Sequence, residues 1–188
     1  MRSSLVGSEM CIRDRPYWVQ GCEIIFSHND DQCLYQISLP EGNDWDASLP
    51  SAPQRVSPKS STHPYMYTDV YRVENGGLLA IVEQATSEDG ADNRMFIGLI
   101  SSVNEPVTVL ADGADFYSNL VVDPAQKQIA WVQWSHPAMP WDETELWTAK
   151  LETGAKTRVQ DRLRVPLESS ASVLSLIHIS EPTRLERI

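Results

Sequence analysis

Short apolar runs recur along the chain, and most of them are rich in Val, Ile, Leu, Tyr and Trp. Representative runs are Leu78–Gln84, Met95–Ile100 and Gln128–Trp134. Turn-forming sequences such as ENGG, EDGADN, DPAQ and ETG separate the runs. Runs of this kind predict β-strands, and the chain lacks the 3.6-residue periodicity that would predict helices. The pattern therefore predicts an all-β protein.

The apolar runs also repeat. When the sequence is shifted by 50 residues, four runs of one unit fall on four runs of the next. The matched pairs are Leu78–Gln84 with Gln128–Trp134, Met95–Ile100 with Glu145–Lys150, Val107–Leu110 with Thr157–Gln160, and Met66–Val73 with Phe116–Asp123. Four strands in a unit of about 40–50 residues are typical of a β-propeller blade. We therefore expect a partial β-propeller of about three four-stranded blades, truncated at both ends.

A partial unit precedes the two matched ones. Cys22–Ser27 and Cys33–Ser38 are predicted as its two middle strands, and Gln54–Ser57 as its outer strand. On the other side of the matched units, Leu163–Val173 is predicted to begin the next blade. The sequence thus indicates blades on both sides of the clearest repeat.

The connection HNDDQ between the two predicted middle strands is short enough for a tight hairpin. Its turn would place Cys22 opposite Ile37 and Cys33 opposite Phe26. The adjacent carboxylates Asp30–Asp31 in this turn are a candidate metal site or catalytic dyad. We favour the alternative, a solvated turn, because Asp residues are common at such positions.

Both ends of the chain have an unusual origin in the genetic code. Leu5–Asp14 and Leu174–Arg184 can be encoded by the two opposite strands of one oligonucleotide, which resembles the transposon-end adapter of sequencing libraries. We therefore assign 1–15 and 174–188 to translated adapter sequence. The β-propeller fragment is expected to span 16–173.

The chain is acidic, with a formal net charge of −11 at pH 7. Binding to nucleic acid or to an anionic membrane needs basic surface, so we expect neither partner. No apolar run approaches the roughly 18 residues of a membrane span. Cys22 and Cys33 are too few for a disulfide scaffold, which makes a reducing compartment the simpler interpretation.

The longest motif of the chain is ADGADFYSNLVVDPAQKQIAWVQWSHPAMPWDETELWTAKL at Ala111–Leu151, and a shorter one is DQCLYQI at Asp31–Ile37. Both resemble the N-terminal β-propeller of the prolyl oligopeptidase family of serine peptidases, in particular its bacterial dipeptidyl aminopeptidase/acylaminoacyl-peptidase-like group. The resemblance covers essentially all of Pro16–Val173. The chain departs from the family pattern where DPAQ at Asp123–Gln126 replaces S-P-D-G, and where Ser135 stands at a position that is commonly Asp.

The resemblance implies a parent protein with two domains. In the family, the propeller caps an α/β-hydrolase domain that carries a Ser nucleophile in a G-x-S-x-G motif, followed by Asp and His. The motif G-x-S-x-G does not occur in this sequence, and His28, His63 and His136 lie in predicted loops. We therefore assign no catalytic residue, no metal ligand and no cofactor.

The function implied is that of a non-catalytic propeller portion of a serine peptidase that hydrolyses short peptides or acyl-peptides. The propeller would gate substrate access to a C-terminal α/β-hydrolase domain of the same polypeptide, with peptides as substrates and the cytoplasm as the expected location. Whether the chain counts as an enzyme is left open. The alternative is a TolB-like or WD-repeat-like propeller that acts as a protein-binding module. The open blades predict poor solubility and no peptidase activity for the chain alone.

The loop Ser135–Thr144 is the candidate substrate or domain-interface site. Two prolines stiffen it, and its candidate contact residues are His136, Met139, Trp141 and Asp142. The alternative is a rigid hairpin that packs on its own blade. His136 has no second ligand at a useful spacing, so we expect no metal here.

Two further groups of side chains are candidate sites. Trp131, Trp134 and Trp147 lie on predicted strands, and we expect them in the core between blades; the alternative is a stacking platform for a ligand. The carboxylates of Asp142, Glu143 and Glu145 are expected to form an exposed face; the alternative is a functional cluster.

Overall fold

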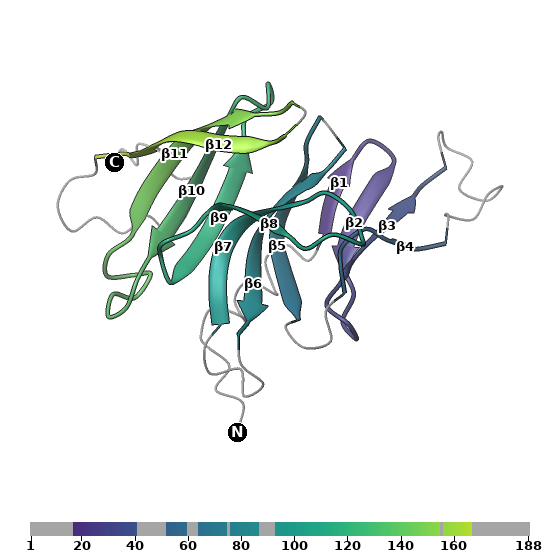
Figure 1. Ribbon diagram of the computed structural model, residues 1–188, viewed down its shortest axis with the longest axis horizontal. Helices are drawn as coiled ribbons and strands as arrows, with labels where there is room; N and C mark the ends of the chain where they lie inside the picture. Colours follow the sequence, from purple (N-terminus) through teal and green to yellow (C-terminus); the bar gives the residue numbers. More distant parts are fainter. Residues whose placement is uncertain are drawn as a thin grey trace, which may run out of the picture.

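The computed structural model describes residues 17–40, 52–59, 64–74, 76–86, 93–154 and 156–166. Within these ranges the chain forms three four-stranded antiparallel sheets and no helix, which confirms the predicted all-β class and partial β-propeller. The sheets stand side by side in chain order, from the purple to the yellow-green part of Figure 1. The segments assigned to adapter sequence, 1–15 and 174–188, lie outside the described residues, as does His63.

Each sheet is one blade, and its strands lie in sequence order across the sheet. Blade 1 consists of β1 (Tyr17–Gln20), β2 (Glu23–Ser27), β3 (Leu34–Ser38) and β4 (Gln54–Arg55). Blade 2 consists of β5 (Tyr65–Arg72), β6 (Leu78–Ala85), β7 (Asn93–Ile100) and β8 (Thr108–Ala111). Blade 3 consists of β9 (Phe116–Val122), β10 (Gln128–Trp134), β11 (Glu145–Glu152) and β12 (Arg158–Arg164).

Blade 2 shows how the sequence produces this stack of sheets. Its strand β6 is apolar on both faces, because a neighbouring blade covers each face. Leu78, Ala80 and Val82 belong to the core shared with blade 1, whereas Leu79 and Ile81 belong to the core shared with blade 3. All five side chains are at most 3% exposed. Burying a side chain of Leu or Ile size contributes about 1.5–3 kcal/mol, so apolar packing holds the blades together.

The hairpin of blade 1 has a different register from the predicted one. The observed pairs Ile24–Ile37 and Phe26–Tyr35 replace the predicted pairs Cys22–Ile37 and Cys33–Phe26. The turn is longer than expected, because the His28 N–H donates to the carbonyl of Cys33 (2.9 Å) and Gln32 adopts a φ of 57°. A shift by two residues leaves every side chain on the face that the alternation predicted.

The repeat of 50 residues breaks at the turn before β10. In blade 2, the Val73 N–H closes the corresponding turn on the carbonyl of Gly77 (3.0 Å). In blade 3, the Asp123 N–H reaches the carbonyl of Gln128 (3.0 Å), which makes this turn one residue longer. Every position of β10 therefore lies one residue further on than the alignment by 50 predicts.

Two outer strands also differ from the prediction. β4 ends at Arg55, short of the predicted end, and beyond it the Ser57 hydroxyl accepts a hydrogen bond from the Leu34 N–H (2.9 Å) in place of a backbone partner. Leu163 lies in β12 opposite Thr148. The prediction that the next blade begins at Leu163 is therefore wrong, since this residue still belongs to blade 3.

Polar contacts also join blade 3 to blade 2. The Gln126 side chain accepts a hydrogen bond from the Glu74 N–H (2.8 Å) and donates one to the Arg72 carbonyl (3.3 Å). Gln126 has a φ of 51°, in the left-handed region that favours glycine, which the related motif has at this position. The departure DPAQ thus keeps the turn and adds a contact between blades. A second contact runs from the Leu120 N–H to the Asp69 carboxylate (3.0 Å).

Candidate functional site

The loop 135–144 connects β10 to β11 and is held together by its own backbone. The Asp142 N–H donates to the Met139 carbonyl (2.9 Å), and the Met139 N–H donates back to the Asp142 carboxylate (3.3 Å). The His136–Pro137 peptide bond is cis. Trp141 projects from this turn with 55% of its surface exposed. The structure therefore brings Met139 and Asp142 together and leaves the Trp141 indole accessible.

His136 lies on a separate part of the loop, against the start of β9. Its ring meets the Phe116 ring edge-on, with 5.1 Å between centroids, and the Trp134 ring stacks on Phe116 at 5.3 Å. The Asp115 carboxylate accepts a hydrogen bond from the His136 N–H (2.9 Å), and the Asp115 N–H donates to the Ser135 hydroxyl (3.2 Å). Asp115 and Phe116 thus anchor the loop.

Sequence reasoning missed these two anchoring residues. They lie about twenty positions before the loop, and only their place in the ADGADFY part of the long motif set them apart. Ser135 stands where the related motif commonly has Asp. Its hydroxyl accepts a hydrogen bond from the Asp115 N–H and so helps to anchor the same loop. The arrangement offers an exposed indole on a stiff loop, which suits contact with another surface or a peptide. It offers no nucleophile paired with a base.

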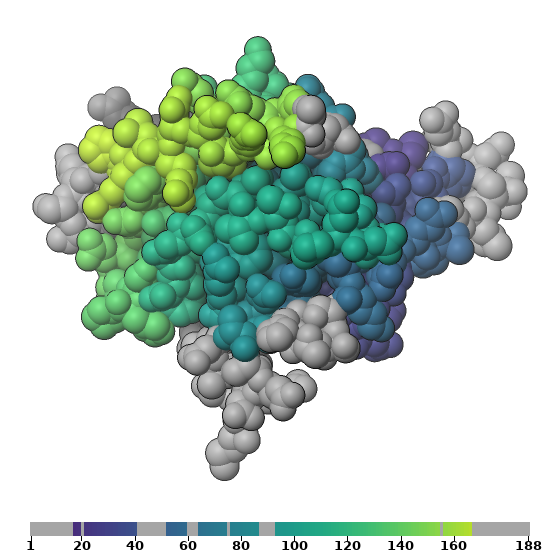
Figure 2. Space-filling model, viewed as in Figure 1, coloured from purple at the N-terminus to yellow at the C-terminus, as the bar shows by residue number. Residues whose placement is uncertain are grey.

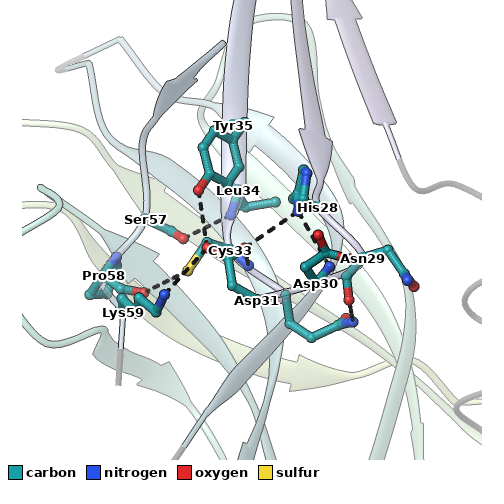
Figure 3. A network of polar contacts seen from close by, with 11 residues as sticks. His28, Asn29, Asp30, Asp31, Cys33, Leu34, Tyr35, Ser57, Pro58 and Lys59 are labelled. Carbon is teal, nitrogen blue, oxygen red and sulfur yellow. Dashed lines mark hydrogen bonds and ion pairs between the residues drawn. The ribbon is translucent and has the colours of Figure 1, made fainter. Parts of the chain in front are cut away.

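A second polar network lies at the β2–β3 turn of blade 1 and is drawn in Figure 3. The Asp31 carboxylate accepts hydrogen bonds from the Cys33 N–H (3.1 Å) and the Tyr35 hydroxyl (3.0 Å). The Lys59 ammonium and the His28 imidazole each lie 3.9 Å from it. Both this turn and the loop 135–144 join the second and third strands of their blades, so they lie at the same end, the lower one in Figure 1.

Protonation of this network follows from its hydrogen bonds. Partial burial would raise the pKa of Asp31, but the bonds from the Cys33 N–H and the Tyr35 hydroxyl outweigh it and lower this pKa. The hydrogen bond that the Tyr35 hydroxyl donates to Asp31 also raises the pKa of Tyr35. Burial raises the pKa of the Cys33 thiol. Asp31 therefore stays ionised and shapes the turn, which supports the turn interpretation of Asp30–Asp31 over the catalytic dyad.

The described part of the chain holds no cluster of His, Cys, Asp and Glu side chains that could bind a metal ion. Cys22 is exposed and Cys33 is buried, and neither forms a disulfide. Among the described residues, no helix is long and apolar enough to cross a membrane.

Trp131 lies in the core between blades 2 and 3, as expected, and is 1% exposed. Its ring stacks on that of Trp147 with 6.3 Å between centroids. Trp134 is half-buried; it stacks on Phe116 at the base of the loop 135–144 and packs against the buried Val132 and Leu146.

The Glu145 carboxylate accepts a hydrogen bond from the indole N–H of Trp147 (2.9 Å). It also forms an ion pair with Arg164 on β12 of the same blade (3.2 Å). Asp142 and Glu143 are exposed as expected, whereas Glu145 is half-buried and acts within the sheet.

A groove of about 540 Å³ runs between the outer strands β8 and β12. Figure 2 shows these strands next to each other on one face, in teal and yellow-green. The lining residues are Leu99, Ser101, Thr108, Val109, Leu110, Lys156, Thr157, Arg158, Val159 and Gln160. The lining contains no His, Cys or carboxylate; its charged side chains are Lys156 and Arg158.

Neither a protein-family model nor a curated protein matches the sequence. The fold is similar to that of solved peptidase structures. A puromycin hydrolase matches with a TM-score of 0.61 and 26% identity over 76% of this chain, and its S511A mutant complexed with PGG matches with 0.64 and 25% over 79%. A Mycobacterium tuberculosis puromycin-hydrolyzing peptidase matches with 0.61 and 27% over 80%.

Puromycin hydrolase is a prolyl oligopeptidase-family peptidase, and the chain resembles its propeller part. The chain spans only 22–23% of the length of these structures. The comparison therefore bears out the family resemblance that the motifs at Ala111–Leu151 and Asp31–Ile37 carried.

Proposed function

We propose that this chain is the non-catalytic propeller portion of a serine peptidase acting on short peptides or acyl-peptides. In this proposal it gates access to a Ser-His-Asp hydrolase domain encoded outside the chain. The observation that carries the proposal is the match to puromycin-hydrolysing peptidases over 76–80% of this chain and less than a quarter of theirs. The two free cysteines fit the cytoplasm as location.

The contact with the hydrolase domain or with substrate is assigned to the loop 135–144. Its exposed Trp141, the turn formed by Met139 and Asp142, and the packing of His136 on Phe116 together give a stiff apolar projection. Loops at one end of a rigid scaffold are the usual carriers of binding residues. Both strand faces of blade 2 are buried against the neighbouring blades and are therefore not accessible to a partner.

The first test is the reading frame downstream of the Val173 codon in the source DNA. A G-x-S-x-G motif followed by Asp and His supports the peptidase. A stop codon or further β-repeats alone would refute it and favour the TolB-like or WD-repeat-like binding module.

The second test uses the protein encoded by that complete frame. Trp141→Ala is expected to raise KM for a peptide of several residues more than for a small ester substrate, because only the peptide passes the propeller loop. Val109→Ala, an exposed position on β8, is the matched control and should change neither value. Equal effects of both substitutions on both substrates would contradict the role of the loop.

A further inference from the structure

The groove between β8 and β12 lies at the outer edges of blades 2 and 3, where the two strands run next to each other in Figure 2. Its volume of about 540 Å³ falls within the range of ligand sites, roughly 300–1,000 Å³. Neighbouring blades pack on each other through their strand faces, as the cores on both sides of blade 2 show. A further blade would therefore cover a terminal face and leave this groove open.

Strand backbone forms part of the groove wall. The lining contains three consecutive residues of each strand, Thr108–Leu110 of β8 and Arg158–Gln160 of β12. Successive side chains of a strand point to opposite faces of its sheet, so three in a row cannot all reach one groove through their side chains. Each of these strands is the last of its sheet, and among the described strands it has a hydrogen-bonded neighbour on one side only. The groove thus gives access to the edges of two strands.

Val159 directs the polar groups of its backbone to this open edge. It lies opposite Leu151 in the β11–β12 ladder. The Leu151 N–H donates to the Lys127 carbonyl beside β10 (2.8 Å), so the backbone of Leu151 points away from β12. In an antiparallel pair of this kind, the backbone groups of both residues point away from each other. The N–H and carbonyl of Val159 therefore lie outside the ladder with β11.

The part of β12 that a further strand could extend coincides with the groove. Residues 158–160 pair with β11 in one register, and the register shifts beyond them. Asp161, the next residue, has a φ of 51°. Irregularities of this kind protect the edges of sheets against unwanted pairing. The regular edge of β12 is therefore confined to the three residues that line the groove.

The charges of the lining select the partner. Lys156 and Arg158 are its charged side chains, and among the described residues neither forms an ion pair. Glu152 lies opposite Arg158 in the ladder but accepts its hydrogen bond from Gln160 (2.9 Å). The chain as a whole has a net charge of −11, but charges further away than about 8 Å are largely screened at physiological salt. Carboxylates are therefore the complementary groups at this site.

We propose that the groove binds an extended acidic peptide, which lies along β12 as a fifth strand of blade 3. The peptide backbone exchanges hydrogen bonds with the N–H and carbonyl of Val159, and its carboxylates lie at Lys156 and Arg158. In this mode of recognition the main-chain bonds give affinity and the side chains give specificity. The loop 135–144 precedes β11 and the groove residues follow it, so the two sites lie at opposite ends of that strand. The proposal goes beyond the peptidase role and does not depend on it.

The test is a titration of a labelled peptide of alternating Glu and Thr with the full chain, followed by fluorescence anisotropy. Two peptides of equal length are the controls. One has Lys in place of Glu and should bind at least tenfold more weakly, because it meets two cations. The other keeps Glu but has all its backbone nitrogens methylated, and it should also bind roughly tenfold more weakly because it cannot donate main-chain hydrogen bonds.

Substitutions in the groove test the same contacts from the side of the protein. Val159→Pro removes an N–H that no ladder bond uses, so the fold should persist while peptide binding falls about fivefold. Val159→Thr keeps both the N–H and the shape of the side chain and should bind like the wild type. Lys156→Glu should weaken binding roughly threefold. Lys127→Glu makes the same charge change at an exposed position outside the lining and should leave binding unchanged.

Four results would overturn the proposal. Absence of saturable binding of the Glu peptide to the wild type excludes the site. Equal binding of the methylated peptide, or displacement by free glutamate at the same carboxylate concentration, indicates a site for small anions. Equal losses for Lys156→Glu and Lys127→Glu indicate a general effect of charge. Circular dichroism checks the fold of each variant, and if Val159→Pro is unfolded, the methylated peptide tests the same hydrogen bonds on the wild type.

Discussion

Gly98 in β7 is required by the packing between blades 1 and 2. A Cβ at this position would lie 2.6 Å from Val107 Cγ1, 2.9 Å from Val82 Cγ2 and 3.0 Å from Phe96 Cε2. All three neighbours belong to the buried core, so none can move into solvent. Overpacking of this kind costs about 1–3 kcal/mol. Alanine regains roughly 0.5–1 kcal/mol over glycine in a strand, so we expect Gly98→Ala to lower the free energy of unfolding by about 1–2 kcal/mol.

Urea unfolding followed by tryptophan fluorescence measures this effect in dilute protein. The midpoint should fall by roughly 0.5–1 M with an unchanged slope. Gly154→Ala is the matched control, because its added Cβ meets nothing within 4 Å and its backbone is not left-handed. The control is expected to be neutral or slightly stabilising. If Gly98→Ala unfolds at the wild-type midpoint, the tight packing of blade 1 on blade 2 is wrong.

Three further substitutions test polar contacts. Burial raises the pKa of the Tyr67 phenol, so the wild type should lose stability above pH ~10, where this phenol ionises in the unfolded chain. Tyr67→Phe should lose less stability over the same pH range, and identical alkaline unfolding curves would refute this. The pKa of Asp31 is lowered despite partial burial, so the wild type should lose stability as pH falls below the ordinary value of 3.8, and Asp31→Asn should lack this component in acid unfolding. Gln126→Gly should change stability by less than about 1 kcal/mol, because relief of the left-handed backbone offsets two lost hydrogen bonds. The same change should speed hydrogen exchange at the Glu74 amide, and unaltered exchange would contradict the contact.

The strands could be predicted because their signals are local. The alternation of apolar runs and turn sequences is visible within about ten residues. The repeat supported each predicted strand with an equivalent strand in the next unit. The register of the β2–β3 hairpin could not be predicted in the same way. The register depends on Gln32 adopting a left-handed backbone conformation, and glutamine is not a residue type that predicts this conformation. The extra residue before β10 was hidden because Gln126 replaces the glycine that marks this turn in the related motif.

The sequence identified the candidate loop through its prolines and its apolar residues Met139 and Trp141, but it did not identify the anchoring residues. Asp115 and Phe116 reach the loop across the sheet, and no spacing rule connects positions that only the fold brings together. The same holds for Lys59, which lies 3.9 Å from Asp31 although the strands β3 and β4 separate the two residues in the sequence. Composition can thus select a loop, whereas its supporting contacts require the three-dimensional arrangement of the blade.

The packing of the blades determines which surfaces of the described chain remain accessible to other molecules. The strands of blade 2 are covered on both faces, and the groove between β8 and β12 contains no His, Cys or carboxylate. Among the described residues, the loops at the blade ends and this groove are therefore the best placed for contact with other molecules. The loops tolerate new side chains without cost to the core, as Ser135 shows by anchoring its loop where the related motif commonly has Asp.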